Sequence, residues 1–447
     1  MNLLAFFGLS SSSNGSSKAA GSAKDTIELC QKLVAERGEL SGTRLATETV
    51  ASFNALNEAG KNEFFDLLVE KFAPNPKAVG KAGADFEQDP TPQNLERLRQ
   101  SIQAPRQDLF HLLNMAPEGT ATLVRMRGHL LRGAEEHPDW VGAADDLAHL
   151  FLSWFNRGFL ELHRIDWNTS AAMLEKLIRY EAVHEIQGWS DLRRRLEADR
   201  RCYAFLHPAL PDEPIVFIEV GLTRGMEGRI QSLVDPELNI GDAQSADCAM
   251  FYSITNCHEG LRGVPFGSFL IKQVVEELSR ELPKLRRFAT LSPVPGFRNW
   301  LANQPELAKL NKHVTNPAWA EDRFGREAVR DQLEAACAYY LIYAKKGGKT
   351  EGKPLDPVAR FHLRNGASLD RINWLGDPST NGLKQSAGLM VNYVYRLREV
   401  ERNHEFYTKE FRVVASSRVE ALAKKCPLAQ PKPKAKEAAT KPEAVAS

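Results

Sequence analysis

The first half of the chain repeats its apolar residues at intervals of three or four, which is the spacing of one face of an α-helix. One such stripe lies in residues 64–72 and another in residues 147–155. Asp25 and Glu28 have the spacing of a capping box, which would open the first helix. The pattern therefore predicts helices packed on one another throughout residues 25–195.

The pattern changes near residue 200, where short apolar runs rich in β-branched and aromatic residues replace the helical stripes. Such runs are typical of strands. They occupy residues 202–205, 215–222, 250–255, 288–291, 371–374 and 388–397, the last being the longest. An amphipathic helix is predicted to begin at Gly267, and two prolines with a glycine exclude regular structure at 292–296. Helices mixed with strands predict an α/β or α+β domain at 196–426, after the all-α domain.

Both ends of the chain lack periodic apolar positions. Residues 10–24 are small and polar, and residues 427–447 are rich in Pro, Lys and Ala. Such segments cannot bury enough apolar surface to offset the entropy lost on ordering. We therefore expect disordered tails at 1–24 and 427–447.

The composition and charge of the chain limit which partners and which cellular compartment are expected. With 58 basic and 57 acidic residues, the chain lacks the basic excess of a protein that coats nucleic acid. No apolar run approaches the roughly 18 residues of a transmembrane helix. The six cysteines form no C-x-x-C pair and no zinc-ligand pattern with histidines, so we expect reduced buried thiols and no metal. The N-terminus lacks a basic region before its apolar start, and no arginine precedes Arg37, so the expected compartment is the cytoplasm.

One candidate anion-binding loop lies between a predicted strand and the predicted helix. It consists of Arg262, Gly263, Val264, Pro265, Phe266, Gly267 and Ser268. Glycines let backbone N–H groups approach a pyrophosphate, and a helix N-terminus favours negative charge. The loop resembles the acyl-CoA loop of the GCN5-related acetyltransferase fold, with Pro265 where that loop usually has glycine. An ordinary strand-to-helix turn explains these residues equally well.

Two side chains are candidates for catalysis. Ser292 lies on a proline-containing turn at the end of a predicted strand, where a hydroxyl is held in one place. His362 lies in the last turn of a short predicted helix, where the helix end would help an imidazole keep its proton near neutral pH and donate it. An ordinary turn hydroxyl and a structural histidine are the alternatives.

Several passages together resemble the malonyl-CoA decarboxylase family. They are RRCY at 200–203, HP at 207–208, FYSI at 251–254, GLRG at 260–263, GSFLIK at 267–272, LSPVPGF at 291–297, FHLRNGA at 361–367, RINW at 371–374 and GLMVNY at 388–393. The helical half is similar to the family at 154–159 and 180–184. The passages keep the family's order and approximate spacing, so the resemblance covers nearly all of the chain between the tails.

The resemblance implies a helical N-terminal domain used in oligomerisation, a homo-oligomer (dimer or tetramer), and an acetyltransferase-like C-terminal domain with a mixed sheet. It implies decarboxylation of malonyl-CoA to acetyl-CoA through a thioester enolate, with no metal or organic cofactor. The family's serine falls on Ser292, its histidine on His362, a tyrosine near its site on Tyr395, and its CoA loop on the loop from Arg262 to Ser268. The animal enzymes have glutamate where this chain has Pro265, so a role for that carboxylate does not transfer.

Two other functions stay open at this point. A CoA-dependent N-acyltransferase could have the same fold, although no feature of the sequence calls for an amine acceptor. A non-catalytic scaffold built on the helical half would not depend on Ser292 or His362. The chemistry of the site must decide between them, because a fold does not fix a function.

Overall fold

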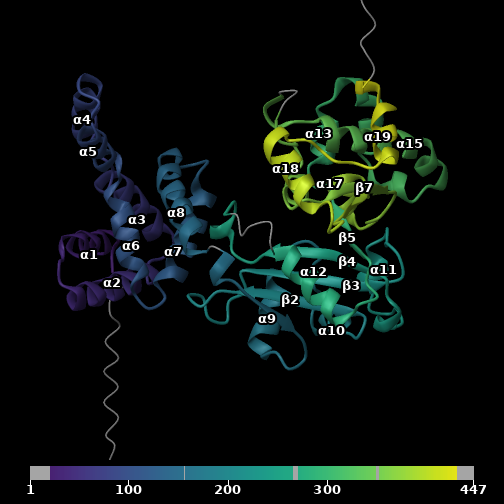
Figure 1. Ribbon diagram of the computed structural model, residues 1–447, viewed down its shortest axis with the longest axis horizontal. Coiled ribbons are helices and arrows are strands. Elements are labelled where there is room, and N and C mark those ends of the chain that lie inside the picture. Colours follow the sequence, from purple (N-terminus) through teal and green to yellow (C-terminus); the bar gives the residue numbers. More distant parts are fainter. Residues whose placement is uncertain (1–20, 156, 265–269, 349–351, 430–447) are drawn as a thin grey trace, which may run out of the picture. The chain divides into compact units, whose positions relative to one another are not determined.

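The computed structural model describes residues 21–155, 157–264, 270–348 and 352–429 (Figure 1). Contacts divide the chain into two compact units. The first runs to Phe155 and takes in Pro208–Pro211 and His258–Val264, and the second contains the other described residues. In the parts of the chain that the structure describes, no helix is long and apolar enough to cross a membrane.

The first unit is helical. Its helices are α1 (Ala23–Ala35), α2 (Glu39–Asn54), α3 (Glu58–Lys71), α4 (Pro76–Gln88), α5 (Pro92–Ile102), α6 (Pro105–Asn114), α7 (Gly119–Gly133) and α8 (Val141–Trp154). Phe53, Phe64 and Phe65 meet edge to face at its centre. The capping box lies one turn before the predicted place, because Ser22 and Asp25 cap each other's backbone N–H groups. Helices α4 and α5 have no buried residue.

The second unit is built on one sheet. Its strands are β1 (Glu161–Ile165), β2 (Arg200–Leu206), β3 (Val216–Thr223), β4 (Cys248–Asn256), β5 (Arg287–Thr290), β6 (Ser292–Pro293), β7 (Ser368–Asn373) and β8 (Met390–Val394). Strands β1 to β4 form an antiparallel meander, and β5 runs parallel to β4 after the crossover helix α12 (Leu270–Glu281). Strand β8 then pairs antiparallel with β5, β6 and β7.

Helices accompany both halves of this sheet. They are α9 (Ala171–Tyr180), α10 (Trp189–Arg195), α11 (Gln231–Val234), α13 (Phe297–Ala302), α14 (Ala308–His313), α15 (Arg323–Tyr343), α16 (Pro357–Arg364), α17 (Thr380–Ser386), α18 (Val400–Glu410) and α19 (Ser417–Lys424). Helices α9 and α10 share one apolar cluster with β2 and β3, in which Leu177, Leu192, Ala204 and Phe217 are fully buried. Figure 1 shows the later helices α13, α15, α17, α18 and α19 gathered around β7.

The predicted architecture, a helical bundle followed by an α/β domain with a mixed sheet, is confirmed. Some local predictions were wrong. Strand β1 lies in a stretch predicted to be helical, and β8 is only five residues long. Ser292–Pro293 forms the short strand β6, although the prolines suggested irregular structure, because two residues opposite β8 suffice for pairing.

The predicted tails fall largely on residues 1–20 and 430–447, which lie outside the described residues. At their inner edges, Ala23 and Lys24 belong to α1, and Pro427–Ala429 forms a short 3₁₀ helix. The described helices therefore reach a few residues into both predicted tails.

Candidate active site

Ser292, His362 and Tyr395 come from three separate segments of the second unit and meet in its interior. Ser292 stands in β6, just after β5 ends, and Tyr395 directly follows β8. His362 lies in the last turn of α16, whose first turn is capped by the buried carboxylate of Asp356 through the N–H of Ala359. All three side chains are at most 5% exposed.

The three side chains form one continuous chain of hydrogen bonds. Ser292 Oγ lies 3.0 Å from His362 Nε2, and His362 Nδ1 lies 2.8 Å from the Tyr395 hydroxyl. At the other end, the Ser292 hydroxyl donates to Thr290 Oγ1 at 2.8 Å. We call Thr290, Ser292, His362 and Tyr395 the relay chain.

The relay chain contains no charged group. Burial lowers the pKa of His362 to about 3 and raises the pKa of Tyr395 well above its usual value. The prediction that the helix end would keep His362 protonated near neutral pH was therefore wrong, because desolvation of the imidazolium outweighs the attraction of one helix end. The imidazole is neutral at neutral pH.

The hydrogen-bond directions assign the tautomer of this neutral imidazole. The single proton of the Ser292 hydroxyl goes to Thr290, so Ser292 accepts from His362 Nε2–H. A neutral imidazole has one N–H, so Nδ1 accepts from the Tyr395 hydroxyl. Every donor in the relay chain thus points in one direction, from Tyr395 towards Thr290.

Strand β8 fixes the serine end of the relay chain. The N–H of Tyr393 donates to Thr290 Oγ1 at 3.2 Å, and the fully buried Asn392 amide donates to the Thr290 carbonyl at 2.7 Å. Neither Thr290 nor Tyr393 was predicted to have a role in the site. Side chains alternate between the two faces of a strand, so Thr290 lies on the same face as Ser292, and Tyr393 on the same face as Tyr395. This spacing of two is the signal from which their place in the site could have been predicted.

The sheet opens next to Ser292. Strands β4 and β5 pair as far as Phe251 and Thr290, and Leu291 N–H donates to the Phe251 carbonyl at 2.9 Å. Beyond this point, β4 residues from Ser253 to Thr255 pair only with β3 among the described residues. One edge of β4 therefore carries backbone groups without a described strand partner. This edge begins just past the Phe251–Leu291 hydrogen bond, and Ser292 is the residue that follows Leu291.

The predicted CoA loop lies only partly within the described residues. Pro265, Phe266, Gly267 and Ser268 are outside them. Arg262, Gly263 and Val264 belong to the first unit, where the Arg127 guanidinium donates to the Arg262 carbonyl at 2.9 Å and to the Gly260 carbonyl at 2.6 Å. Gly263 has φ of +82°, a conformation that glycine adopts without strain.

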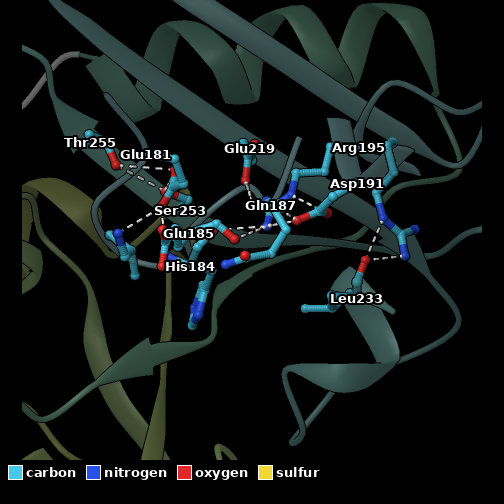
Figure 2. Close-up of polar contacts among 12 residues, drawn as sticks. Glu181, His184, Glu185, Gln187, Asp191, Arg195, Glu219, Leu233, Ser253 and Thr255 are labelled. Carbon is cyan, nitrogen blue, oxygen red and sulfur yellow. Dashed lines mark hydrogen bonds and ion pairs between the residues drawn. The ribbon is translucent and has the colours of Figure 1, made fainter. Parts of the chain in front are cut away.

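A second buried polar group lies elsewhere in the second unit, and the sequence analysis missed it (Figure 2). We call it the anchoring cluster; its members are Glu181, Asp191, Arg195, Glu219, Ser253 and Thr255. Arg195 pairs with Glu219 at 2.8 Å and with Asp191 at 3.1 Å, and it donates to the His184 carbonyl at 2.8 Å.

Glu181 completes the anchoring cluster by joining the α9–α10 loop to β4. One carboxylate oxygen accepts from the N–H groups of Val183 and His184, both at 2.7 Å. The other accepts from the hydroxyls of Ser253 at 2.7 Å and Thr255 at 3.3 Å. The cluster therefore fastens the loop between α9 and α10 to β3 and β4.

Neither group has its side chains arranged as a metal site. Over the ranges that the structure describes, no three His, Cys, Asp or Glu side chains gather in a way that could hold a metal ion. The relay chain offers two hydroxyls, a phenol and one neutral imidazole, which together suit the movement of a proton between a donor and a carbon or oxygen acceptor.

Comparison with known proteins points to one family. A family model described as the malonyl-CoA decarboxylase C-terminal domain matches residues 158–437, and one described as the N-terminal domain matches residues 72–155. The mitochondrial malonyl-CoA decarboxylase of Anser anser anser is 34% identical over 428 residues, which are 86% of this chain and 84% of that protein.

Two solved structures are similar over most of the chain. The crystal structure of malonyl-CoA decarboxylase from Rhodopseudomonas palustris has 44% sequence identity and a TM-score of 0.84, and the match covers 90% of this chain and 100% of that one. The corresponding structure from Agrobacterium vitis has 45% identity and a TM-score of 0.81, with 89% and 99% covered.

Proposed function

Since the chain belongs to the malonyl-CoA decarboxylase family, we propose that it converts malonyl-CoA to acetyl-CoA and carbon dioxide. Loss of carbon dioxide from a malonyl thioester leaves an enolate, whose charge is shared with the thioester oxygen. A protein that catalyses this step must stabilise that oxygen and protonate the carbon. The observation that carries the proposal is the relay chain, because it offers a proton at Ser292 and a route for its replacement.

In the proposed reaction, the bond between the carboxylate and the α-carbon breaks and carbon dioxide leaves. The Ser292 hydroxyl turns from Thr290 to the carbanionic carbon and gives it a proton. Ser292 then takes the proton of His362 Nε2, and His362 Nδ1 takes the proton of the Tyr395 hydroxyl. Solvent finally returns a proton to Tyr395, so the number of protons on the protein is unchanged. The imidazole now carries its proton on Nδ1, and this proton must exchange back to Nε2 before the next turnover. Such positioned proton transfer contributes about 10²–10⁴ in rate.

The remaining parts of the proposed site bind the thioester and the CoA moiety. Backbone N–H groups on the edge of β4 beyond Phe251 are proposed donors to the thioester oxygen, since that edge lacks a described strand partner. The residues from Arg262 to Ser268 are the proposed CoA loop. The proposed reaction uses no metal and no organic cofactor, and the proposed compartment is the cytoplasm, in keeping with six cysteines that form no disulfide.

The helical unit is proposed to join copies of this chain into a dimer or tetramer. Helices α4 and α5 bury no residue, and Leu95 and Ile102 on α5 are 44% and 53% exposed. A second copy would cover these apolar side chains. Light scattering on Leu95→Glu and Ile102→Glu should show smaller particles than the wild type, whereas Phe324→Glu, on the exposed start of α15, should not.

The proposed activity is tested with purified protein and malonyl-CoA in the presence of a chelator and without any amine. We expect carbon dioxide and acetyl-CoA in equal amounts. No release of carbon dioxide would overturn the proposal, and loss of release on chelation would overturn its metal-independent form. A product that forms only when an amine is added, and carries the acyl group on nitrogen, would identify an N-acyltransferase.

A further inference from the structure

Tyr393 lies directly against the imidazole of His362. Side chains alternate along β8, so Val391, Tyr393 and Tyr395 share one face of the strand. Ser292 stands opposite Val391 in the sheet, at one end of this row. The ring of Tyr393 is stacked on the His362 ring, with centroids 4.6 Å apart and planes 25° apart. Tyr393 thus covers one face of the His362 ring, and Tyr395 is hydrogen-bonded to its Nδ1.

Two hydrogen bonds alone do not fix the plane of an imidazole. The ring can still rotate about its Cβ–Cγ bond, and this tilt moves both Nδ1 and Nε2 out of the plane that holds their partners. A tilt turns each N–H or lone pair out of line with its partner, and a hydrogen bond weakens steeply as its angle falls. An aromatic ring against one face of the imidazole opposes that tilt.

We propose that Tyr393 is a positioning residue whose ring holds the plane of His362, so that both imidazole nitrogens stay aligned with Ser292 and Tyr395. This inference rests on the proposed function and deepens it, since it concerns how the relay chain is kept in line. The hydroxyl of Tyr393 makes no hydrogen bond to Ser292 or to Tyr395, so Tyr393 acts only through its contact with His362.

The ring, and not the hydroxyl, carries this role. The Tyr393 hydroxyl is buried and has no hydrogen-bond partner in the described structure. The titratable groups that act on it are Asp356 at the cap of α16, Cys337 and Tyr340 on α15, and Tyr395. It is therefore not a link in the relay chain, and its removal leaves every hydrogen bond of the chain in place.

The stacked ring also keeps His362 uncharged by excluding water from one face. The groups that face the imidazole are Tyr393 and Tyr395 from β8, Ser292 from β6 and Phe361 from its own helix, and none of them carries a charge at neutral pH. Replacing the ring with a smaller side chain admits water. The pKa of His362 then rises from about 3 towards the ordinary value of about 6.5.

The test compares Tyr393→Phe, which keeps the ring, with Tyr393→Leu, which removes it. Tyr203→Leu is the matched control, because Tyr203 is as deeply buried, has an unpaired hydroxyl among the described residues and lies on β2. We expect Tyr393→Phe to keep kcat within about twofold. We expect Tyr393→Leu to lower kcat by about tenfold or more at a similar KM, because misplaced catalytic groups cost rate and not binding.

The pH profile supplies a readout that a loss of packing alone would not change. In Tyr393→Leu, kcat/KM should fall as the pH drops below about 6. The fall should remain when Asp356→Asn is added in the same chain, which assigns it to His362 and not to Asp356. Tyr203→Leu should lower the melting temperature without either kinetic change. If Tyr393→Leu does not fold, Tyr393→Met takes its place, since methionine fills irregular gaps.

Three results would overturn the inference. They are a tenfold loss in Tyr393→Phe, wild-type kcat with a flat profile in the folded Leu or Met variant, and an equal kinetic loss in Tyr203→Leu. Failure of the proposed function looks different, because His362→Ala would then keep its turnover. An inactive His362→Ala beside a fully active Tyr393→Leu removes only the inference.

Discussion

The relay chain and the anchoring cluster are both buried in the second unit, yet they are built from opposite kinds of group. The relay chain links hydroxyls and one neutral imidazole, and each member can give up one proton and accept another. The anchoring cluster links carboxylates to a guanidinium, which keeps its charge under all ordinary conditions (Figure 2). One group is suited to moving protons, and the other to holding a loop against the sheet.

The energetics of burial explain this division. A buried charge is stable only beside a partner, so removing one member of the anchoring cluster leaves the other uncompensated and destabilises the fold. A neutral hydrogen-bonded group costs far less to leave behind. Substitutions in the relay chain should therefore act on turnover, and substitutions in the anchoring cluster on stability.

The largest effect is expected from the relay chain itself. His362→Ala and Ser292→Ala should each lower kcat by roughly 10²–10⁴, because each removes a positioned proton donor or its partner. The melting temperature should fall only by the modest amount that follows from losing neutral hydrogen bonds, since no buried charge loses its partner. Steady-state decarboxylation and calorimetry on the same preparations provide the two measurements.

A matched control separates chemistry from packing. Ser386 is 1% exposed and donates to two backbone carbonyls in the same unit, away from the relay chain. Ser386→Ala should cost stability without lowering kcat. Near-normal turnover in His362→Ala or Ser292→Ala would remove that residue from the proposed mechanism.

The next largest effect is expected from Arg195. Arg195→Met removes the partner of the fully buried Glu219, and the free energy of unfolding should fall by up to about 3–5 kcal/mol. The loss should grow as the pH rises, because burial raises the pKa of Glu219 to about 7 and a protonated carboxyl needs no partner. Turnover per folded molecule should stay within about twofold, because Arg195 has no contact with the relay chain. Chemical denaturation measures the first quantity, and activity corrected for the folded fraction measures the second.

A double variant sharpens this prediction. In Arg195→Met with Glu219→Leu, neither charge of the fully buried pair remains, so most of the lost stability should return. The part that does not return is the lost ion pair with Asp191, whose side chain is 16% exposed. If the double variant is as unstable as the sum of the two single variants, the ion pair is not what makes Arg195 important.

A smaller effect is expected from Glu181. Glu181→Gln keeps one oxygen acceptor for the N–H groups of Val183 and His184, and its amide can donate to the Ser253 and Thr255 hydroxyls. The free energy of unfolding should fall by only about 1–2 kcal/mol. Glu175→Gln, on the exposed side of α9, is the control and should change nothing. A loss as large as that of Arg195→Met would contradict the view that Glu181 acts through hydrogen bonds and not through its charge.

Local sequence patterns were sufficient for most of the sheet. The apolar runs at 215–222 and 250–255 predicted β3 and β4, because buried strands need β-branched and aromatic side chains whatever their neighbours are. Strand β6 could not be predicted, since Ser292 and Pro293 become a strand only through pairing with Val391 and Met390. That pairing joins segments about a hundred positions apart and leaves no local signal.

The site was predictable only in its parts. Ser292 and His362 stood out by their turn and helix positions, but their 3.0 Å contact spans 70 positions and no spacing rule reaches so far. The charge of His362 was predicted wrongly because the helix end is visible in the sequence and the burial is not. Glu219 did leave a signal that went unused, as it is the one charged residue within the apolar run at 215–222.

The smallest expected effect is an absence of pH dependence. An ordinary histidine is half protonated at about pH 6.5. The pKa of His362 is about 3, so its imidazole stays neutral as the pH falls from about 8 to about 5. The kcat/KM profile, which reports groups of the free enzyme, should therefore show no acid limb from His362 in this window.

Burial raises the pKa of Asp356 to about 6, so a limb near pH 6 that disappears in Asp356→Asn belongs to Asp356. A limb near pH 6.5 that survives this substitution would mean that His362 is charged in the free enzyme, and the contrast between a neutral relay chain and a charged anchoring cluster would no longer hold.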